Sequence, residues 1–227
     1  MVSPILRLIR RMRHKRLHAP ATSVEFVKLG SDYGGWPIAI AELPPHPVIY
    51  SFGVGEDISF DLAAVARFGA TIHAFDPTPR SQKWLRAQQL PASFHFHPVG
   101  IAAQDGQVEF FPPENEAHVS FSKTPSREQG PPPIVAEVRS LDSLVRELGG
   151  TPPTVVKMDI EGFEYEVVDA LVHSPVRPAQ LLIEFHHGMY SASEQDTLTA
   201  VEKLDAIGYR VFFVSDTGRE YGFIHSS

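Results

Sequence analysis

The chain of 227 residues predicts an α/β fold, a doubly wound and mostly parallel sheet with helices on both faces. From residue 48 onward, short apolar runs alternate with segments in which apolar side chains recur at helical spacing. The last two apolar runs are joined by Asp216-Thr217-Gly218, a turn sequence typical of hairpins, so a C-terminal antiparallel hairpin strand is expected. Such sheets bind ligands beyond the carboxyl ends of their strands.

Each predicted strand is a short apolar run that ends at a glycine, a proline or a polar turn. The first run ends at Gly53, and the second is cut off by Asp76-Pro77. Residues 112–133 are rich in proline, and their apolar residues follow neither the spacing of a helix nor the alternation of a strand. A long loop is therefore expected there. The strands are expected over residues 48–52, 71–75, 94–99, 108–111, 134–138, 155–158, 181–185, 210–214 and 221–224.

The predicted helices place apolar side chains three or four positions apart, and three of the five end close to a glycine. Gly69, Gly149 and Gly208 take this position, because glycine adopts the left-handed conformation that often follows a helix. The helices are expected over residues 60–68, 81–89, 140–148, 164–172 and 194–206.

The composition excludes several classes of protein. Hydrophobic residues make up 43% and charged residues 21%, which is ordinary for a globular chain and unlike a disordered one or a coiled coil. No apolar run reaches the roughly 18 residues that span a bilayer. The absence of cysteine excludes disulfides, thiolate zinc sites and cysteine nucleophiles, and it fits a cytoplasmic protein.

Positive charge is concentrated at the N-terminus of an otherwise acidic chain, whose net charge is −7. Residues 1–16 hold six of the 20 lysines and arginines, and the first acidic residue is Glu25. Apolar residues recur at helical spacing between the arginines, so residues 1–19 are expected to form a basic helix or tail. Residues 20–46 are interpreted as an N-terminal preface, and residues 47–227 as the main domain.

Two interpretations of the basic segment remain open. Residues 1–16 are either a solvated terminal helix or an attachment to an anionic membrane surface, which would place the protein peripherally at the inner membrane face. Nucleic-acid binding is not expected, because the acidic body would repel the phosphate backbone. A secretory signal is not expected either, because the arginines interrupt the apolar core that it requires.

The loop after the first strand has the composition of a ligand-binding turn. Gly53 and Gly55 let the backbone approach a ligand, and the following helix offers free N–H groups. Ile58 stands where a dinucleotide fingerprint has its third glycine, and a phosphate-binding Gly-Lys-Ser/Thr is absent. Glu56 and Asp57 would repel a polyphosphate, so a cationic or zwitterionic ligand fits better. A plain turn between strand and helix is the alternative.

Asp76 ends the second strand, 21 positions after Gly55. An acidic residue at about this distance accepts hydrogen bonds from ribose hydroxyls in nucleoside-binding sheets. The alternative is a helix N-cap ahead of Pro77. Together with the glycine loop, Asp76 favours recognition of a ribose.

Several stretches together resemble the FkbM-type methyltransferases. The most specific is Val155–Glu164, which contains Lys-Met-Asp-Ile-Glu-Gly. The stretches Ser51–Asp57, Ala74–Pro77 and Leu182–His187 also resemble this family, and the resemblance extends over about residues 47–224. Two positions depart from the family pattern, because Asp76 replaces the more usual glutamate and Asp57 replaces a glycine.

The resemblance implies a Rossmann-like class I methyltransferase fold with a seven-stranded sheet and S-adenosylmethionine as cofactor. It implies O-methylation of a hydroxyl on a sugar, glycolipid or other small molecule, so a small-molecule or glycan acceptor is expected. An aromatic turn in the preface is expected to lie over the mouth of the cofactor site, and packing of Trp36 in the core is the alternative. The expected cofactor-binding residues are Tyr33, Trp36, Phe52, Gly53, Gly55, Asp57, Asp76, Pro77, Gly100, Ile101 and Asp159.

Acidic residues and histidines follow the later strands, where the chemistry is expected. Methyl transfer to a hydroxyl needs alignment of donor and acceptor and a group that accepts the proton. His186 is the candidate general base, because its ordinary pKa is near neutrality, and Glu161 and Glu184 are further catalytic candidates. Charge stabilisation of the following helix is the alternative role of Glu161.

Three further roles are expected at these strand ends. His187 and His118 are candidates for substrate contact, His118 from the long loop. A divalent metal is an alternative use of Asp159, Glu184 and His186, whose oxygen and nitrogen atoms suit such an ion. The spacing of these residues does not demand a metal.

Two other functions compete with methyl transfer. A nicotinamide-dependent oxidoreductase would use the same sheet edge, but the missing third glycine and the acidic loop speak against it. A non-catalytic module would keep the fold as a scaffold, and the intact glycines and strand-end acids speak against that.

Overall fold

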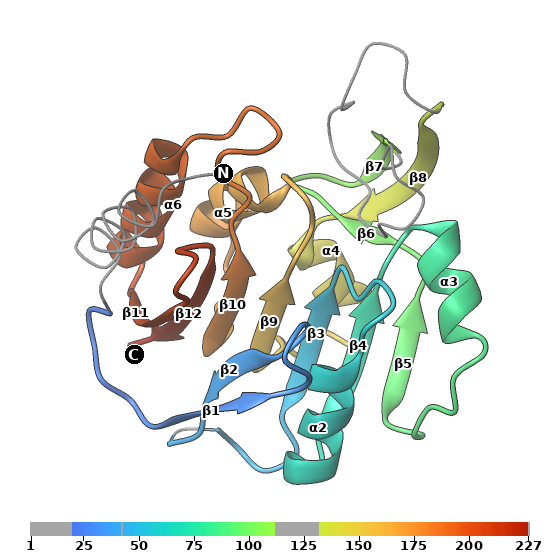
Figure 1. Ribbon diagram of the computed structural model, residues 1–227, viewed down its shortest axis with the longest axis horizontal. Helices are drawn as coiled ribbons and strands as arrows, with labels where there is room; N and C mark the ends of the chain where they lie inside the picture. The colour runs from blue at the N-terminus through green and yellow to red at the C-terminus, as the bar shows by residue number, and fades with distance from the viewer. Residues whose placement is uncertain (1–19, 42, 112–131, 227) are drawn as a thin grey trace, which may run out of the picture.

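The computed structural model describes residues 20–41, 43–111 and 132–226, and it confirms the doubly wound α/β fold. A seven-stranded sheet has the order β11-β12-β10-β9-β3-β4-β5 (Figure 1), and every strand but β12 runs in the same direction. The strands are β3 (Val48–Phe52), β4 (Thr71–Phe75), β5 (Phe94–His97), β9 (Val155–Met158), β10 (Gln180–Glu184), β11 (Tyr209–Val214) and β12 (Glu220–His225).

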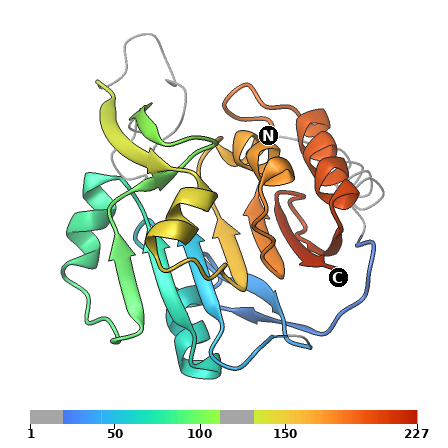
Figure 2. The same cartoon turned by 180° about the vertical axis from the view of Figure 1, so that it is seen from behind.

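Helices cover both faces of this sheet, as the alternation of strands and helices predicts. One face packs against α2 (Ser59–Phe68) and α3 (Pro79–Leu85), through Phe60, Ala64 and Leu85. The opposite face, seen in Figure 2, packs against α4 (Leu141–Glu147), α5 (Glu164–His173) and α6 (Glu194–Ala206). Two apolar cores therefore hold the strands rigid, which fixes the positions of the residues at the strand ends.

The predicted C-terminal hairpin forms, but its antiparallel strand does not lie at the edge of the sheet. β12 inserts between β10 and β11, and β11 is the edge strand. Residues 221–224 of β12 are all buried, whereas β11 is only partly so. A strand that is apolar on both faces is more stable between two neighbours than at an edge.

The preface contains a two-stranded hairpin that the sequence did not predict, β1 (Phe26–Leu29) paired with β2 (Trp36–Ala39). All four residues of β2 are buried, so the strand shows no alternation, and Pro37 argues against a strand. The side-chain amide of Gln180 holds the backbone of Ala39, with N···O distances of 2.9 and 2.8 Å. The hairpin thus packs on the main sheet, beside α2 (Figure 1).

A second small sheet stands beyond the carboxyl ends of the main strands. Its order is β6 (Gly100–Ile101), β8 (Ile134–Arg139), β7 (Gly106–Phe110). The strand predicted over residues 94–99 is split in consequence, because the chain leaves the main sheet after His97 and joins the small one at Gly100. Phe110 packs against Phe163, so the small sheet forms a wall beside the residues that follow β9.

Two predictions fall outside the described residues, namely the basic segment 1–19 and almost all of the loop 112–133. In the described part of the chain, no helix combines the length and apolar character needed to cross a membrane.

Candidate functional site

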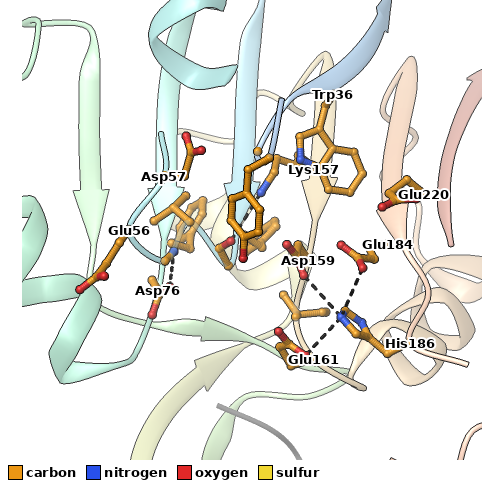
Figure 3. Close-up of a pocket in the computed structure, with 18 of the residues that line it drawn as sticks. Trp36, Glu56, Asp57, Asp76, Lys157, Asp159, Glu161, Glu184, His186 and Glu220 are labelled. Carbon is orange, nitrogen blue, oxygen red and sulfur yellow. Dashed lines mark hydrogen bonds and ion pairs between the residues drawn. The ribbon is translucent and has the colours of Figure 1, made fainter. Parts of the chain in front are cut away.

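A cavity of about 710 Å³ opens beyond the carboxyl ends of β3, β4, β9 and β10 (Figure 3). The strand-end residues singled out in the sequence meet there, although they come from segments far apart in the chain. Those that line the cavity are Tyr33, Trp36, Phe52, Gly53, Gly55, Asp57, Asp76, Pro77, Gly100, Ile101, Asp159, Glu161, Glu184 and His186.

Gly53 brings the ends of β3 and β9 into contact. Its φ of +71° lies in the left-handed region, and a Cβ there would stand 1.7 Å from the carbonyl oxygen of Asp159. Its N–H donates to the carbonyl of Phe75 at 3.0 Å, which ties the loop to β4 as well. Only glycine fits this close backbone contact, and the loop that it forms, the glycine cradle, lines the cavity.

Asp76 joins the glycine loop to the end of β4. The N–H of Gly55 donates to Asp76 Oδ2 at 2.9 Å, and the N–H and hydroxyl of Thr78 donate to Asp76 Oδ1 at 2.9 and 2.6 Å. Thr78 occupies the N-cap position of α3, so Asp76 is not the N-cap. The carboxylate is therefore held rigidly at the cavity wall, at the position where a ribose is expected.

Aromatic rings and small residues line the wall beside Asp76. Phe52 and Phe75 stack with ring centroids 4.5 Å apart, and both line the cavity. A Cβ at Gly100 would stand 3.2 Å from Pro77, so Gly100 leaves room that a larger residue would fill. An apolar wall of this kind suits one face of a planar base.

The acidic residues of the glycine loop have partners within the protein. Arg80 forms an ion pair with Glu56 at 2.9 Å and lowers the pKa of that carboxyl. Burial would raise the pKa of Asp57, but hydrogen bonds from Ser59 and Ser31 lower it. Asp57 points away from Asp159 (Figure 3). Asp57 therefore holds the turn that carries Tyr33, and because it also lines the cavity, its contact with a cofactor stays a prediction.

Three other carboxylates surround one buried histidine. Nε2 of His186 lies 3.2 Å from Glu161, 3.6 Å from Asp159 and 3.8 Å from Glu184 (Figure 3). The His186 side chain is only 4% exposed, whereas Asp159 and Glu184 remain open to the cavity. The negative charge available to a cationic ligand is therefore concentrated at the ends of β9 and β10.

Glu164 is a site residue that sequence reasoning missed. Its fully buried carboxylate accepts hydrogen bonds from the N–H groups of Ile160 and Gly162 at 3.1 and 3.0 Å. It also contacts Nδ1 of His186 at 2.8 Å. The sequence showed it only as the first residue of α5, where acidic residues are common. In the fold it shapes the β9–α5 turn and directs Nε2 of His186 toward the cavity.

The carboxylates and the histidine shift one another's proton affinity. Burial and then the charge of Asp159 raise the pKa of Glu184 to about 8, and burial raises that of Asp159 to about 6. Burial would lower the pKa of His186, but the hydrogen bond and charge of Glu164, with Glu161 and Asp159, raise it to about 10. A histidine with this pKa already carries its proton near neutral pH, so these surroundings do not favour His186 as the general base.

Tyr190 is a second residue that the sequence did not indicate. Its hydroxyl donates to Glu161 at 2.7 Å. Glu161 itself has a φ of +53°, an uncommon conformation for a residue other than glycine. Strained backbone of this kind is found where a side chain must point in a functional direction.

The structure corrects the placement of one substrate candidate. His187 lies on the opposite side of the strand end from His186, as alternation predicts, and Nδ1 of its buried ring contacts the Thr197 hydroxyl on α6 at 3.1 Å. This packing against a helix makes His187 structural rather than a contact for a ligand in the cavity. His118 lies outside the described residues.

Asp159, Glu184 and His186 also satisfy the geometry of a metal-binding group. One potential ligand atom from each lies within 4.8 Å of the others. A metal-bound histidine usually donates its second ring N–H to a carboxylate, and Glu164 is placed to accept that bond. The donor set of two carboxylates and an imidazole suits a divalent ion with oxygen and nitrogen ligands.

Comparison with known proteins shows the family. Residues 49–211 match one protein family, which is described as the methyltransferase FkbM domain. A probable methyltransferase-like protein 24 from Rattus norvegicus is 29% identical over 140 residues, which are 61% of this chain and 32% of that protein. A probable methyltransferase-like protein 24 from Homo sapiens is 28% identical over 140 residues, which are likewise 61% of this chain and 32% of that protein. The chain thus matches about a third of the length of these curated relatives.

Two solved structures align with the chain at low sequence identity. A methyltransferase FkbM from Methylobacillus flagellatus KT aligns with a TM-score of 0.47 and 15% identity, over 79% of this chain and 43% of that one. The Methanococcus jannaschii fibrillarin pre-rRNA processing protein aligns with a TM-score of 0.48 and 9% identity, over 82% of this chain and 69% of that one.

Proposed function

Because the chain belongs to the FkbM methyltransferase family, we propose that it is an S-adenosylmethionine-dependent O-methyltransferase acting on a hydroxyl of a sugar, glycolipid or other small molecule. The observation that carries the proposal is the cavity itself. One cavity joins the glycine cradle, an aspartate at a ribose position and a cluster of carboxylates. This combination suits a ligand that has a nucleoside at one end and positive charge at the other.

The residues of the cavity suggest how the cofactor lies. We assign the adenine to the apolar wall at Phe75 and Gly100, and the ribose hydroxyls to Asp76. The chain that follows the ribose would pass along the glycine loop, which lines the cavity and packs directly against Asp159. The carboxylates beyond it favour the positive sulfonium electrostatically. The loop supports this cofactor over NAD, because Ile58 stands where a dinucleotide fingerprint has its third glycine.

S-adenosylmethionine supplies a methyl group whose carbon–sulfur bond breaks as the acceptor oxygen forms its bond to carbon, and the electron pair remains on sulfur. The protein must then hold the hydroxyl in line and take its proton. We assign the proton to Glu161, whose carboxylate lines the cavity beside Tyr190. His186, held by Glu164, carries positive charge against the carboxylates and keeps them in position.

The binding step tests this function directly. We expect the protein to bind S-adenosylmethionine and S-adenosylhomocysteine in calorimetric titrations, and not to bind NAD. Binding of NAD without S-adenosylmethionine would support the oxidoreductase alternative and would contradict our proposal. If the protein bound none of the three ligands, the result would favour the non-catalytic module.

We also propose that Asp159, Glu184 and His186 hold a divalent metal ion. Such an ion would lower the pKa of a bound acceptor hydroxyl. In the metal-bound form Nε2 of His186 would be unprotonated and would coordinate the ion. The ion would then replace the imidazolium charge that lies among the carboxylates when no metal is bound.

Manganese binding followed by electron paramagnetic resonance tests the metal site without an assay of activity. We expect Glu184→Gln to weaken Mn²⁺ binding by roughly 10- to 100-fold, because a charged ligand is lost. The matched control is Glu56→Gln, since Glu56 lines the same cavity but pairs with Arg80. Equal Mn²⁺ affinity of the wild type and the Glu184 variant would show that the metal proposal is wrong.

A further inference from the structure

Lys157 is a buried cation at the centre of an acidic cavity. It lies on β9, two residues before Asp159, and is only 5% exposed. Most of the ionisable residues that line the cavity are carboxylates, and Lys157 and Lys28 are the lysines among them. Lys28 is exposed, so Lys157 is the lysine that faces the interior of the site.

The ammonium group of Lys157 has few partners of its own. Its Nζ lies 3.5 Å from the carbonyl oxygen of Gly53, a long hydrogen bond, and 5.2 Å from the ring centre of Trp36. Among the residues that the structure describes, no carboxylate forms an ion pair with it within 4.0 Å. Burial of an ammonium is costly unless an anion or several hydrogen bonds compensate it. The charges of Asp57, Asp61 and Asp159 act on Lys157 from greater distance. What the ammonium lacks is a direct anionic partner on its cavity side.

The position of Lys157 matches one end of the proposed cofactor. Figure 3 shows it between Asp76 on one side and the group of Glu184 and His186 on the other. With the ribose at Asp76, the methionine moiety extends from the cradle at Gly53 toward β9. That moiety carries an ammonium, a sulfonium and a single anion, its α-carboxylate. Asp159 and its neighbours suit the two cationic groups, and Lys157 suits the anion.

We infer that Lys157 binds the α-carboxylate of the cofactor's methionine moiety and selects for ligands that carry it. The inference rests on the proposed function and adds the recognition of one cofactor group to it. The ammonium would exchange its single long hydrogen bond for a charge-assisted one, while Trp36 excludes water from one side. Lys157 is thus a specificity-determining residue rather than a buried structural lysine.

Three ligands separate this role from a general effect on the cavity. S-adenosylmethionine has the carboxylate, decarboxylated S-adenosylmethionine lacks only that group, and 5′-methylthioadenosine lacks the whole amino-acid tail. Calorimetry with the wild type and Lys157→Met should show that the variant binds S-adenosylmethionine about 10- to 100-fold more weakly, the usual effect of one charged hydrogen bond. We expect the affinity for each of the other two ligands to change by less than about threefold.

Two control variants remove the same charge elsewhere. Lys28→Met tests the other lysine of the cavity, and Lys83→Met removes an exposed charge on α3. We expect both to leave the preference for the carboxylate within about threefold of the wild type. Loss of the preference in Lys28→Met instead of Lys157→Met would overturn the inference.

Failure of this inference is distinguishable from failure of the proposed function. If Lys157→Met weakens all three ligands equally, or none of them, the lysine does not read the carboxylate, although the cofactor assignment stands. If the wild-type protein binds none of the three ligands, the proposed function fails and the inference fails with it.

Discussion

Gly53→Ala is expected to abolish binding of S-adenosylhomocysteine, with a loss of more than about 100-fold, and to destabilise the protein. The added Cβ would stand 1.7 Å from the carbonyl oxygen of Asp159, and the backbone at Gly53 has a φ of +71°. Overpacking costs about 1–3 kcal/mol and the left-handed conformation about 1–2 kcal/mol, so the free energy of unfolding should fall by about 2–5 kcal/mol. Calorimetry and urea denaturation measure the two effects.

Gly106→Ala is the matched control for this prediction. Gly106 lies in β7, has no atoms within 4 Å of the position of a Cβ, and is outside the left-handed region. Its substitution should leave both stability and affinity close to those of the wild type. A Gly53→Ala protein with wild-type stability and affinity within threefold would show that the cradle is wrongly placed.

Glu164→Gln is expected to lower turnover by about 100-fold while the affinity for S-adenosylhomocysteine changes little. The variant keeps the size of the side chain but removes the charge that holds Nδ1 of His186 and two backbone N–H groups. A misplacement of about 1 Å in a catalytic group can cost this factor in rate. The NH2 group of the glutamine would also replace one carboxylate oxygen and leave a buried backbone N–H without an acceptor. The free energy of unfolding should therefore fall by about 1–3 kcal/mol.

Steady-state kinetics and urea denaturation test Glu164 against an exposed residue. Glu202→Gln on α6 removes the same charge at the surface, and we expect its turnover and free energy of unfolding to remain at their wild-type values. Unchanged turnover in a Glu164→Gln protein that has lost stability would reduce Glu164 to a purely structural role. A fall in cofactor affinity equal to the fall in turnover would contradict its action through His186.

The parallel sheet and most of its ligand-facing edge were predictable because their signals are local. Gly53 and Asp76 follow apolar runs directly, and parallel strands bring such residues to one edge. The hairpin at residues 26–39 was not predictable in this way. Its second strand is buried on both sides and contains Pro37, so neither alternation nor composition indicates a strand.

The partners of the site residues depend on contacts that spacing does not reveal. Glu56 and Asp57 have the composition of a cation site, but Arg80 and Ser31 bind them from other parts of the chain. Glu164 resembles an ordinary first residue of a helix until the β9–α5 turn brings it to His186. The pKa of that histidine depends on Glu164, Glu161 and Asp159, which only the fold brings to its ring, so the ordinary value was a poor guide.

The crystal structure of the protein with S-adenosylhomocysteine tests the central claim most directly. We predict the ribose hydroxyls within about 3 Å of Asp76 and the sulfur on the side of the cavity that holds Asp159, Glu184 and His186. The adenine should lie against the wall at Phe75 and Gly100. A ligand bound outside this cavity, or one whose ribose lies at His186 and whose tail lies at Asp76, would contradict the account.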